Sequence, residues 1–374
     1  MIYFDNASTT KYKPEEVYEA FEYYIREIGV SPGRGSYQLG IEASRMLFKS
    51  RKIVGKYFGM SKPENVVFTK NSTEAINLFF YGFLTQGDHV VISCYEHNAV
   101  LRPLQKLKEN GIIEYSVISR NDLELSASEI CKKYFKKSTK LFATTLASNL
   151  SGRIIFREDV AEEFKKNGAT VFVDSSQGAG KIFLNMERQN IDFLAFTGHK
   201  DLFAIPGVGG LCFNSSRNLE PLIQGGTGIH GEEYTNPNVF PEKYEAGTLN
   251  MPAIWSLHAG ITFILNNKNC IIKKEKELTE YLIMKLKELE NIQLYDIEHT
   301  RVSTCCINVK NMSSSEVVAY LDKNEICVRG GIHCAILAHE ALDTVKTGAI
   351  RISLSYLNEK EEIDELIRLL KECR

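Results

Sequence analysis

The chain has 374 residues, of which 44% are hydrophobic and 25% are charged. These proportions are ordinary for a globular protein, and the length suits two domains that share an interface. Acidic and basic residues nearly balance, 47 against 45, so no overall charge recruits nucleic acid or an anionic membrane surface. Residues 1–10 lack the basic start and apolar run of a signal peptide, and no apolar stretch is long enough to cross a bilayer. We expect a cytoplasmic protein with neither nucleic acid nor membrane as a partner.

The nine cysteines are scattered along the chain without CxxC spacing or the density of a disulfide scaffold. This usage is typical of a reducing compartment. Cys305 and Cys306 are adjacent in an apolar run, and on a strand their side chains point to opposite faces. Because they cannot then share a metal ion, we expect no metal site.

Between residues 15 and 252 helical and strand patterns alternate, which predicts an α/β domain with a mainly parallel sheet. Expected helices cover residues 14–28, 42–58, 75–84, 100–110 and 157–166, and expected strands cover 66–69, 90–93, 141–145, 170–173, 193–197 and 210–213. From residue 253 the pattern changes to two long helices, 253–265 and 271–289, and strands near 304–309 and 326–329. We expect a smaller α+β domain built from residues 1–14 and 253–374, packed tightly on the large domain with the functional cleft between them.

Polar residues follow several of the expected strands, at the sheet edge where α/β proteins bind ligands. After strand 66–69, Asn71, Ser72, Thr73 and Glu74 open a helix, where free backbone N–H groups and two hydroxyls could bind a phosphate. The alternative is an ordinary helix cap with an acid in the first turn.

Asp174 ends one expected strand and Lys200 follows the next, 26 residues later, which fits one crossover. Pyridoxal 5'-phosphate (PLP) needs this pair: an amine that binds the cofactor covalently and a carboxylate that keeps its ring nitrogen protonated. A simple ion pair is the alternative. His97, after strand 90–93, could stack on a planar cofactor, and Asn149 could hydrogen-bond a ring oxygen; the alternatives are a structural histidine and a turn residue.

Two further residues carry candidate chemistry near the C-terminus. Arg351 interrupts an apolar strand pattern, where it needs a carboxylate from an amino-acid substrate or from an internal acid. Cys334 follows a Gly-Gly pair at the expected start of a helix, where the helix dipole and His333 would favour the thiolate, which can attack sulfur. Burial as a small hydrophobe is the alternative for Cys334.

Seven segments stand in one order along the chain: YFDNASTT (3–10), NSTEAIN (71–77), EH (96–97), VDSSQ (173–177), TGHK (197–200), EAGT (245–248) and RIS (351–353). Together they resemble the class V aminotransferase family and, within it, the cysteine desulfurase branch. The resemblance implies PLP-dependent fold type I, with a mainly parallel seven-stranded sheet, and a homodimer whose active sites are shared between subunits.

The resemblance also implies roles for the matching residues. Lys200 would bind the cofactor and move protons, Asp174 would bind the ring nitrogen, Gln177 the ring hydroxyl, and His97 would stack on the ring. Ser72, Thr73, Thr197 and His199 would surround the phosphate, with Thr248 supplied by the partner subunit. Asn149 and Arg351 would hold the substrate carboxylate, and Asn6 is a weaker substrate-side candidate.

The segment RGGIHCA (329–335) resembles the branch members whose catalytic cysteine lies in a short His-Cys-Ala loop, a group that includes selenocysteine lyases. Ile332 replaces a histidine of the best-known members, and residues 32–35 keep an Arg-Gly pair without its neighbouring histidine. The implied reaction converts L-cysteine to L-alanine and leaves a persulfide on Cys334 for an acceptor thiol or protein. The alternatives are a selenocysteine lyase, another class V aminotransferase or lyase in which Cys334 is incidental, and a PLP-free scaffold.

Overall fold

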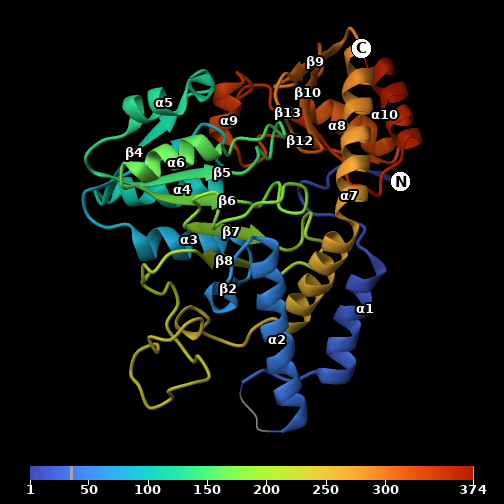
Figure 1. Cartoon of the computed structure of the whole chain (residues 1–374). Coiled ribbons are helices and arrows are strands. Elements are labelled where there is room, and N and C mark those ends of the chain that lie inside the picture. Colours follow the sequence, from blue (N-terminus) through green and yellow to red (C-terminus); the bar gives the residue numbers. More distant parts are fainter. Residues whose placement is uncertain (34–36, 374) are drawn as a thin grey trace.

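The computed structural model describes residues 1–33 and 37–373. Arg34 and Gly35 therefore lie outside the described residues. Figure 1 shows two lobes: one holds a large sheet covered by helices, and the other holds the C-terminal elements with the N-terminal residues beside them. In the described residues, no helix combines the length and the apolar character that a membrane crossing requires.

The large sheet has seven strands in the order β2-β8-β7-β6-β5-β3-β4. All run in one direction except β8, which is antiparallel to both of its neighbours. The predicted mainly parallel seven-stranded sheet is therefore confirmed. Its strands are β2 (Val66–Thr69), β3 (Asp88–Ser93), β4 (Ile113–Ile118), β5 (Thr139–Thr145), β6 (Thr170–Asp174), β7 (Phe193–Thr197) and β8 (Gly209–Phe213).

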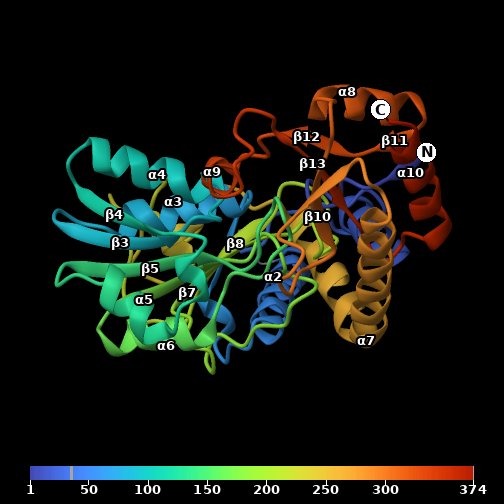
Figure 2. The same ribbon diagram turned by 90° about the horizontal axis from the view of Figure 1, so that it is seen from above.

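Helices cover both faces of this sheet, as Figure 2 shows: α3 and α4 lie on one face and α5 and α6 on the other. Each face buries its own apolar cluster, which explains why the central strands read as unbroken hydrophobic runs. The helices of this lobe are α1 (Glu15–Tyr23), continued by a π-helical turn (Tyr24–Ile28), α2 (Gln38–Tyr57), α3 (Ser72–Phe83), α4 (Asn98–Glu109), α5 (Ala127–Tyr134) and α6 (Glu158–Lys166).

The C-terminal lobe has an antiparallel sheet in the order β12-β13-β10-β9 and a third apolar cluster of its own. The N-terminal strand β1 (Ile2–Tyr3) joins this lobe by pairing in parallel with β11 (Ile326–Cys327). The other elements are β9 (Ile292–Tyr295), β10 (Thr304–Val309), α8 (Ser314–Lys323), β12 (Arg329–Gly331), α9 (Ile336–Ala341), β13 (Ala349–Ser353) and α10 (Lys360–Glu372). The division into residues 15–252 and the remainder stays a prediction.

One expectation was wrong: residues 253–265 and 271–289 do not form two helices. A single helix, α7 (Met251–Lys287), runs through both. The expected break falls at Asn266, Asn267 and Asn269, residues of low helix propensity. Because α7 packs against α1 and α2 with its first part and against α10 and β9 further on, tertiary packing overrides that local weakness.

Two elements of the large lobe had no counterpart in the predicted pattern. Strand β4 lies at the sheet edge and mixes buried and exposed positions, so its sequence IEYSVI has neither a continuous apolar run nor clean alternation. Helix α5 has eight residues, too short for a clear period, and it begins with a capping box between Ser126 and Glu129.

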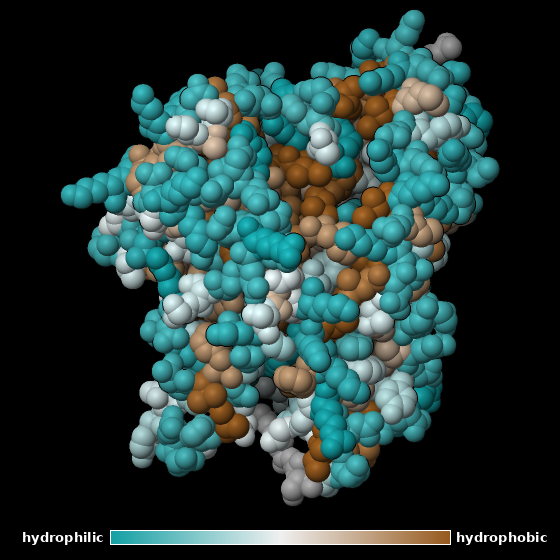
Figure 3. Space-filling view, in the orientation of Figure 1, coloured by the Kyte–Doolittle hydropathy of each residue, from teal (hydrophilic) through white to brown (hydrophobic). Residues whose placement is uncertain are grey.

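A hollow separates the two lobes on the face drawn in Figure 3, where apolar side chains gather. A cavity of about 710 Å³ lies between α7 and the loops of the large lobe. Its walls include Ile182, Ile272 and Met284. None of the predicted site residues lines this cavity, so the candidate site lies elsewhere between the lobes.

Candidate active site

The candidate site lies where the parallel strands of the large sheet end. Asp174 is the last residue of β6, and Lys200 follows the end of the neighbouring strand β7. Because parallel strands present their carboxyl ends at one edge, crossover topology alone brings the two together. The strand-end prediction therefore correctly located the Asp174 and Lys200 backbones.

Asp174 and Lys200 influence each other's charge. Asp174 is buried, which raises the pKa of its carboxyl, while hydrogen bonds from Ser176 and the positive charge of Lys200 lower it. Its Oδ1 accepts from the Ser176 N–H at 2.9 Å and from the Ser176 hydroxyl at 2.5 Å. Burial lowers the pKa of Lys200 to about 8, against the opposing effect of Asp174. The lysine is thus close to the pKa at which an amine reacts as a nucleophile near neutral pH.

His97 caps the N-terminus of α4 through its side chain. Its Nδ1 accepts from the Ala99 N–H at 3.0 Å, so the neutral ring carries its proton on Nε2. Burial, followed by the charge of Lys200, lowers the pKa of His97 to about 3. The ring is therefore neutral, lies near Lys200 and has an Nε2–H that can donate a hydrogen bond. A neutral flat ring of this kind can stack on a planar cofactor.

The start of α3 lies beside the end of β7. Strand β8 separates β2 from β7, and a side chain at Gly209 would meet the Asn71 backbone carbon and the Phe196 carbonyl oxygen at 2.6 Å. This close approach requires glycine. Asn71 caps α3 by accepting from the Glu74 N–H at 2.9 Å, which leaves the N–H groups of Ser72 and Thr73 for a ligand.

Thr197 and His199 extend this group from the end of β7. The Thr197 Oγ1 is buried and has no hydrogen-bond partner within the described part of the chain. Burial, with smaller effects of Lys200 and Lys13, lowers the pKa of His199 to about 4, so its ring is neutral. An unpaired buried hydroxyl beside a helix N-terminus fits a phosphate group.

Gln177 and Asn6 connect the N-terminal segment to this edge. The Gln177 side chain is buried and its Nε2 donates to the Ala7 carbonyl at 2.8 Å, so its Oε1 remains to accept a hydrogen bond. The side-chain Nδ2 of Asn6 donates to the carbonyls of Ser353 at 3.0 Å and Tyr3 at 3.3 Å. Asn6 thus holds β13 against the N-terminal segment, and its role toward a substrate stays a prediction.

Arg351 meets an internal acid, Asp5, and its contact with a substrate carboxylate stays a prediction. The side chain is 1% exposed. Its Nη2 lies 2.6 Å from Asp5 Oδ1 and 2.8 Å from Ser8 Oγ, and its Nη1 donates to the Asn149 carbonyl at 3.0 Å. The Nε of Arg351 is buried without a partner among the described residues. The Nε–H of the guanidinium therefore remains for an anion even though Asp5 is present.

The Cys334 loop follows β12 and reaches the start of α4. The Asn98 N–H donates to the Cys334 carbonyl at 2.8 Å, and the Asn149 Nδ2 donates to the His333 carbonyl at 2.7 Å. Cys334 is exposed. The first bond holds the Cys334 loop against Asn98, the residue that follows His97. The second holds the loop against Asn149, whose carbonyl accepts from Arg351. Asn149 thus anchors this loop, and its contact with a substrate carboxylate stays a prediction.

One part of the Cys334 prediction was wrong. His333 does not supply a positive charge to the neighbouring thiol, since burial and the nearby Arg351 lower the pKa of His333 to about 3. The helix that follows, α9, has only six residues and starts two residues after Cys334. The helix dipole that was expected to favour the Cys334 thiolate is therefore weak, because a macrodipole is the sum of the aligned peptides of a longer helix.

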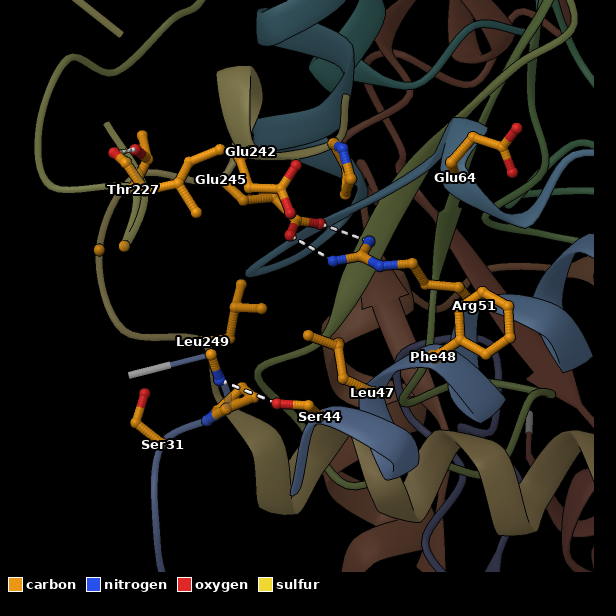
Figure 4. Close-up of a pocket in the computed structure, with 16 residues that line it drawn as sticks. Ser31, Ser44, Leu47, Phe48, Arg51, Glu64, Thr227, Glu242, Glu245 and Leu249 are labelled. Carbon is orange, nitrogen blue, oxygen red and sulfur yellow. Dashed lines mark hydrogen bonds and ion pairs between the residues drawn. The ribbon is translucent and has the colours of Figure 1, made fainter. Parts of the chain in front are cut away.

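Thr248 is exposed in a segment that lies outside this cluster. Figure 4 shows the cavity beside it, where the Arg51 guanidinium faces the Glu245 carboxylate. The two form a buried pair, with Nη1 to Oε1 at 2.7 Å and Nη2 to Oε2 at 2.5 Å, and Glu245 Oε1 also accepts from the Phe68 N–H. This pair fixes the EAGT segment against α2 and β2, and the assignment of Thr248 to the partner's site stays a prediction.

Four site residues were absent from the predicted set. Arg329 donates to Ser8 Oγ at 2.9 Å, so it shares that hydroxyl with Arg351, and Asp5 completes the group. Glu96 is fully buried, accepts from Ser93 and Thr145, and has its pKa raised to about 8 by burial. All four lie inside or next to the segments that carry the resemblance, and Arg329 and Arg351 reach Ser8 from more than 300 residues away.

Comparison with known proteins places this geometry in a family. The model of the family described as aminotransferase class-V matches residues 2–366. Proteins named probable cysteine desulfurase from Pyrococcus abyssi and Methanothermobacter thermautotrophicus are each 32% identical, covering 100% and 99% of this chain and 94% of each relative. The solved apo structure of a cysteine desulfurase from Thermococcus onnurineus is 32% identical, has a TM-score of 0.91, and covers 100% of this chain and 94% of its own. The resemblance found in the sequence is thus confirmed, and the chain belongs to the class V aminotransferase family.

Proposed function

We propose that this protein is a PLP-dependent cysteine desulfurase that converts L-cysteine to L-alanine and receives the sulfur on Cys334. The observation that carries the proposal is the convergence of three features: Asp174 and Lys200 at neighbouring strand ends, an arginine with an unpaired N–H, and an exposed thiol on a loop bonded to both Asn98 and Asn149. The names of the relatives agree with it.

The residues present fit PLP. The buried, unpaired Thr197 Oγ1, with Ser72, Thr73 and His199, would hold the phosphate, and the partner's Thr248 would complete that group. Asp174 would hold the ring nitrogen, Gln177 the ring hydroxyl, and His97 would stack on the ring. When bound, PLP supplies the electron sink that lets an amino acid lose its α-proton.

Lys200 would hold the cofactor covalently, and its Nζ would accept the α-proton of the substrate. Its lowered pKa of about 8 makes the neutral amine accessible for that step. Arg351 would hold the substrate carboxylate through its unpaired Nε, beside the Asn149 carbonyl. The neutral His97 ring, with its proton on Nε2, would stack on the cofactor and assist protonation of the substrate.

The sulfur step belongs to Cys334. Its thiolate would attack the substrate Sγ, so that a sulfur–sulfur bond forms while the Cβ–Sγ bond breaks and its electron pair remains on Cβ. A proton from Lys200 or His97 then completes the methyl group of alanine. The persulfide on Cys334 is exposed, which suits transfer to an acceptor thiol or acceptor protein.

A homodimer would bring the partner's Thr248 to the residues that would hold the phosphate of PLP. The cysteines of the chain are unpaired in the described structure, which suits a reducing cytoplasm where a persulfide can be passed on.

An amino-acid panel tests the substrate assignment. With L-cysteine we expect sulfide, in the presence of a reducing thiol, and L-alanine in equal amounts, because each turnover breaks one Cβ–Sγ bond. L-Selenocysteine, L-serine and L-aspartate serve as comparisons, with sulfide or selenide and alanine measured separately. Alanine formed from L-selenocysteine alone would make the protein a selenocysteine lyase. Transfer of an amino group without sulfide would make it an aminotransferase, and either result contradicts the proposal.

Arg351→Lys is expected to raise KM for L-cysteine at least about tenfold while changing kcat less. Lysine keeps the positive charge near Asp5 but lacks the Nε–H that would hold the substrate carboxylate. Steady-state kinetics with L-cysteine measure the effect, and Arg368→Lys, on the surface of α10, is the matched control. A KM within twofold of the parent would show that Arg351 does not bind the substrate carboxylate.

A further inference from the structure

The loop that carries Cys334 adopts an unusual backbone conformation. His333 and Cys334 are consecutive, neither is glycine, and both have positive φ, 55° and 57°. Side chains disfavour this left-handed region, and residues persist there when their surroundings hold them in place. Hydrogen bonds to the carbonyls of His333 and Cys334, together with the Ala335 N–H to the Ile332 carbonyl at 3.0 Å, supply part of that hold.

The His333 side chain supplies the rest through a buried row of polar groups. His333 Nε2 lies 3.1 Å from the Arg329 carbonyl oxygen, and His333 Nδ1 lies 3.5 Å from His339 Nε2. His339 Nδ1 in turn lies 2.8 Å from Thr344 Oγ1. The rings are nearly parallel, at 7°, and all three side chains are buried. The row therefore connects the Cys334 loop, which precedes α9, to Thr344, which follows α9.

When both rings are neutral, one assignment of protons satisfies every contact in this row. The Arg329 carbonyl only accepts, so His333 carries its proton on Nε2 and, when neutral, has a lone pair on Nδ1. That lone pair accepts from His339 Nε2–H, which leaves His339 Nδ1 to accept from the Thr344 hydroxyl. Each contact then has one proton and one acceptor. A second proton on His333 would place two N–H groups opposite each other, and the contact between the two rings would break. A second proton on His339 would turn the Thr344 hydroxyl, which would then accept from Nδ1 and donate to the His339 carbonyl at 3.5 Å.

We propose that this row, from Thr344 through His339 and His333 to the Arg329 carbonyl, positions the Cys334 thiol for the sulfur step. The inference rests on the proposed role of Cys334. His339 and Thr344 are positioning residues, since they act on the thiol only through His333. Arg329 links the row to the substrate side, because its guanidinium bonds to the Ser8 hydroxyl that also binds Arg351.

The electrostatic surroundings favour the neutral state of both rings, which is the state of this proton assignment. Burial is the largest cause of the low pKa of His333, and the positive charges of Arg351 and Arg329, with His339, lower it further. Burial also lowers the pKa of His339, against the opposing effects of the Thr344 and Ile332 backbone. At neutral pH both histidines are therefore uncharged.

A matched pair of variants tests the proposal in the holoenzyme. Thr344→Val keeps the shape of the side chain but removes the hydroxyl donor, whereas Thr344→Ser keeps the donor. We expect Thr344→Val to lower kcat for sulfide release about 10- to 100-fold, the scale of a misplaced reacting group. KM for L-cysteine should stay within twofold, the visible band of bound PLP should be unchanged, and Thr344→Ser should restore kcat. Unchanged kcat in Thr344→Val, or equal losses in both variants, would overturn the proposal.

Hydrogen exchange of the peptide that spans residues 330–342 separates this proposal from the proposed function. In Thr344→Val we expect the amides of this peptide to exchange at least about tenfold faster, while the peptide of β6 exchanges as in the parent. This result does not depend on the reaction that Cys334 performs. If exchange is faster in Thr344→Val but Cys334→Ala still releases sulfide at the rate of the parent, the proposed function is wrong and the role of the row in holding the loop stands. Parent-like exchange and kcat in Thr344→Val would remove the positioning row alone.

Discussion

Lys200→Ala is expected to lose the visible absorption band of bound PLP and to release sulfide from L-cysteine more than about 1,000-fold more slowly. Losses of this scale follow when an enzyme loses the group that carries its covalent chemistry and its proton transfer. Lys200 stands at the end of β7 beside Asp174, and its lowered pKa suits both tasks. Absorption spectra and sulfide assays on the purified holoenzyme measure the two effects.

Lys200→Arg is the matched control for charge. Arginine keeps a positive charge near Asp174, but its guanidinium stays protonated and does not bind the cofactor covalently. We expect the same loss of band and activity as in Lys200→Ala, with thermal unfolding close to that of the parent. A variant of Lys200 that keeps both the parent's visible band and its activity would show that another residue binds the cofactor.

Cys334→Ala is expected to release sulfide from L-cysteine more than about 100-fold more slowly while keeping the visible band of PLP. The residues proposed to bind the cofactor lie at the strand ends, and Cys334 lies on a separate loop, so removing the thiol should leave cofactor binding unchanged. In the parent, mass spectrometry after a single addition of L-cysteine should find one extra sulfur on the peptide that contains Cys334. Sulfide release by Cys334→Ala at the rate of the parent would disprove the sulfur-receiving role.

Cys270→Ala is the matched control for this experiment, because Cys270 and Cys334 are both exposed. Cys270 lies on α7, away from the strand ends. We expect Cys270→Ala to keep full sulfide release and to leave the extra sulfur on Cys334. An equal loss in both variants would point to a general effect of removing a surface thiol.

Much of the large lobe could be predicted from the chain because its signals are local. The buried strands of the sheet are short apolar runs, and the helices between them follow a clear period, so the crossover topology and its parallel sheet follow. The same signals failed at β4, whose edge position leaves its pattern mixed, and at α7, whose asparagines suggested a break. In each failure, packing against neighbouring elements decided the structure.

The chain pattern was enough to place Asp174 and Lys200 at one edge of the sheet, because residues at the ends of successive parallel strands share that edge whatever surrounds them. The contacts of Asp5 with Arg351 and of Asn149 with the His333 carbonyl follow from the packing of the two lobes. These partners lie 346 and 184 residues apart. They meet because the N-terminal segment and the C-terminal sheet pack against the large lobe. Hydrophobic periodicity predicts the elements themselves, while contacts between lobes depend on the shapes of two finished surfaces.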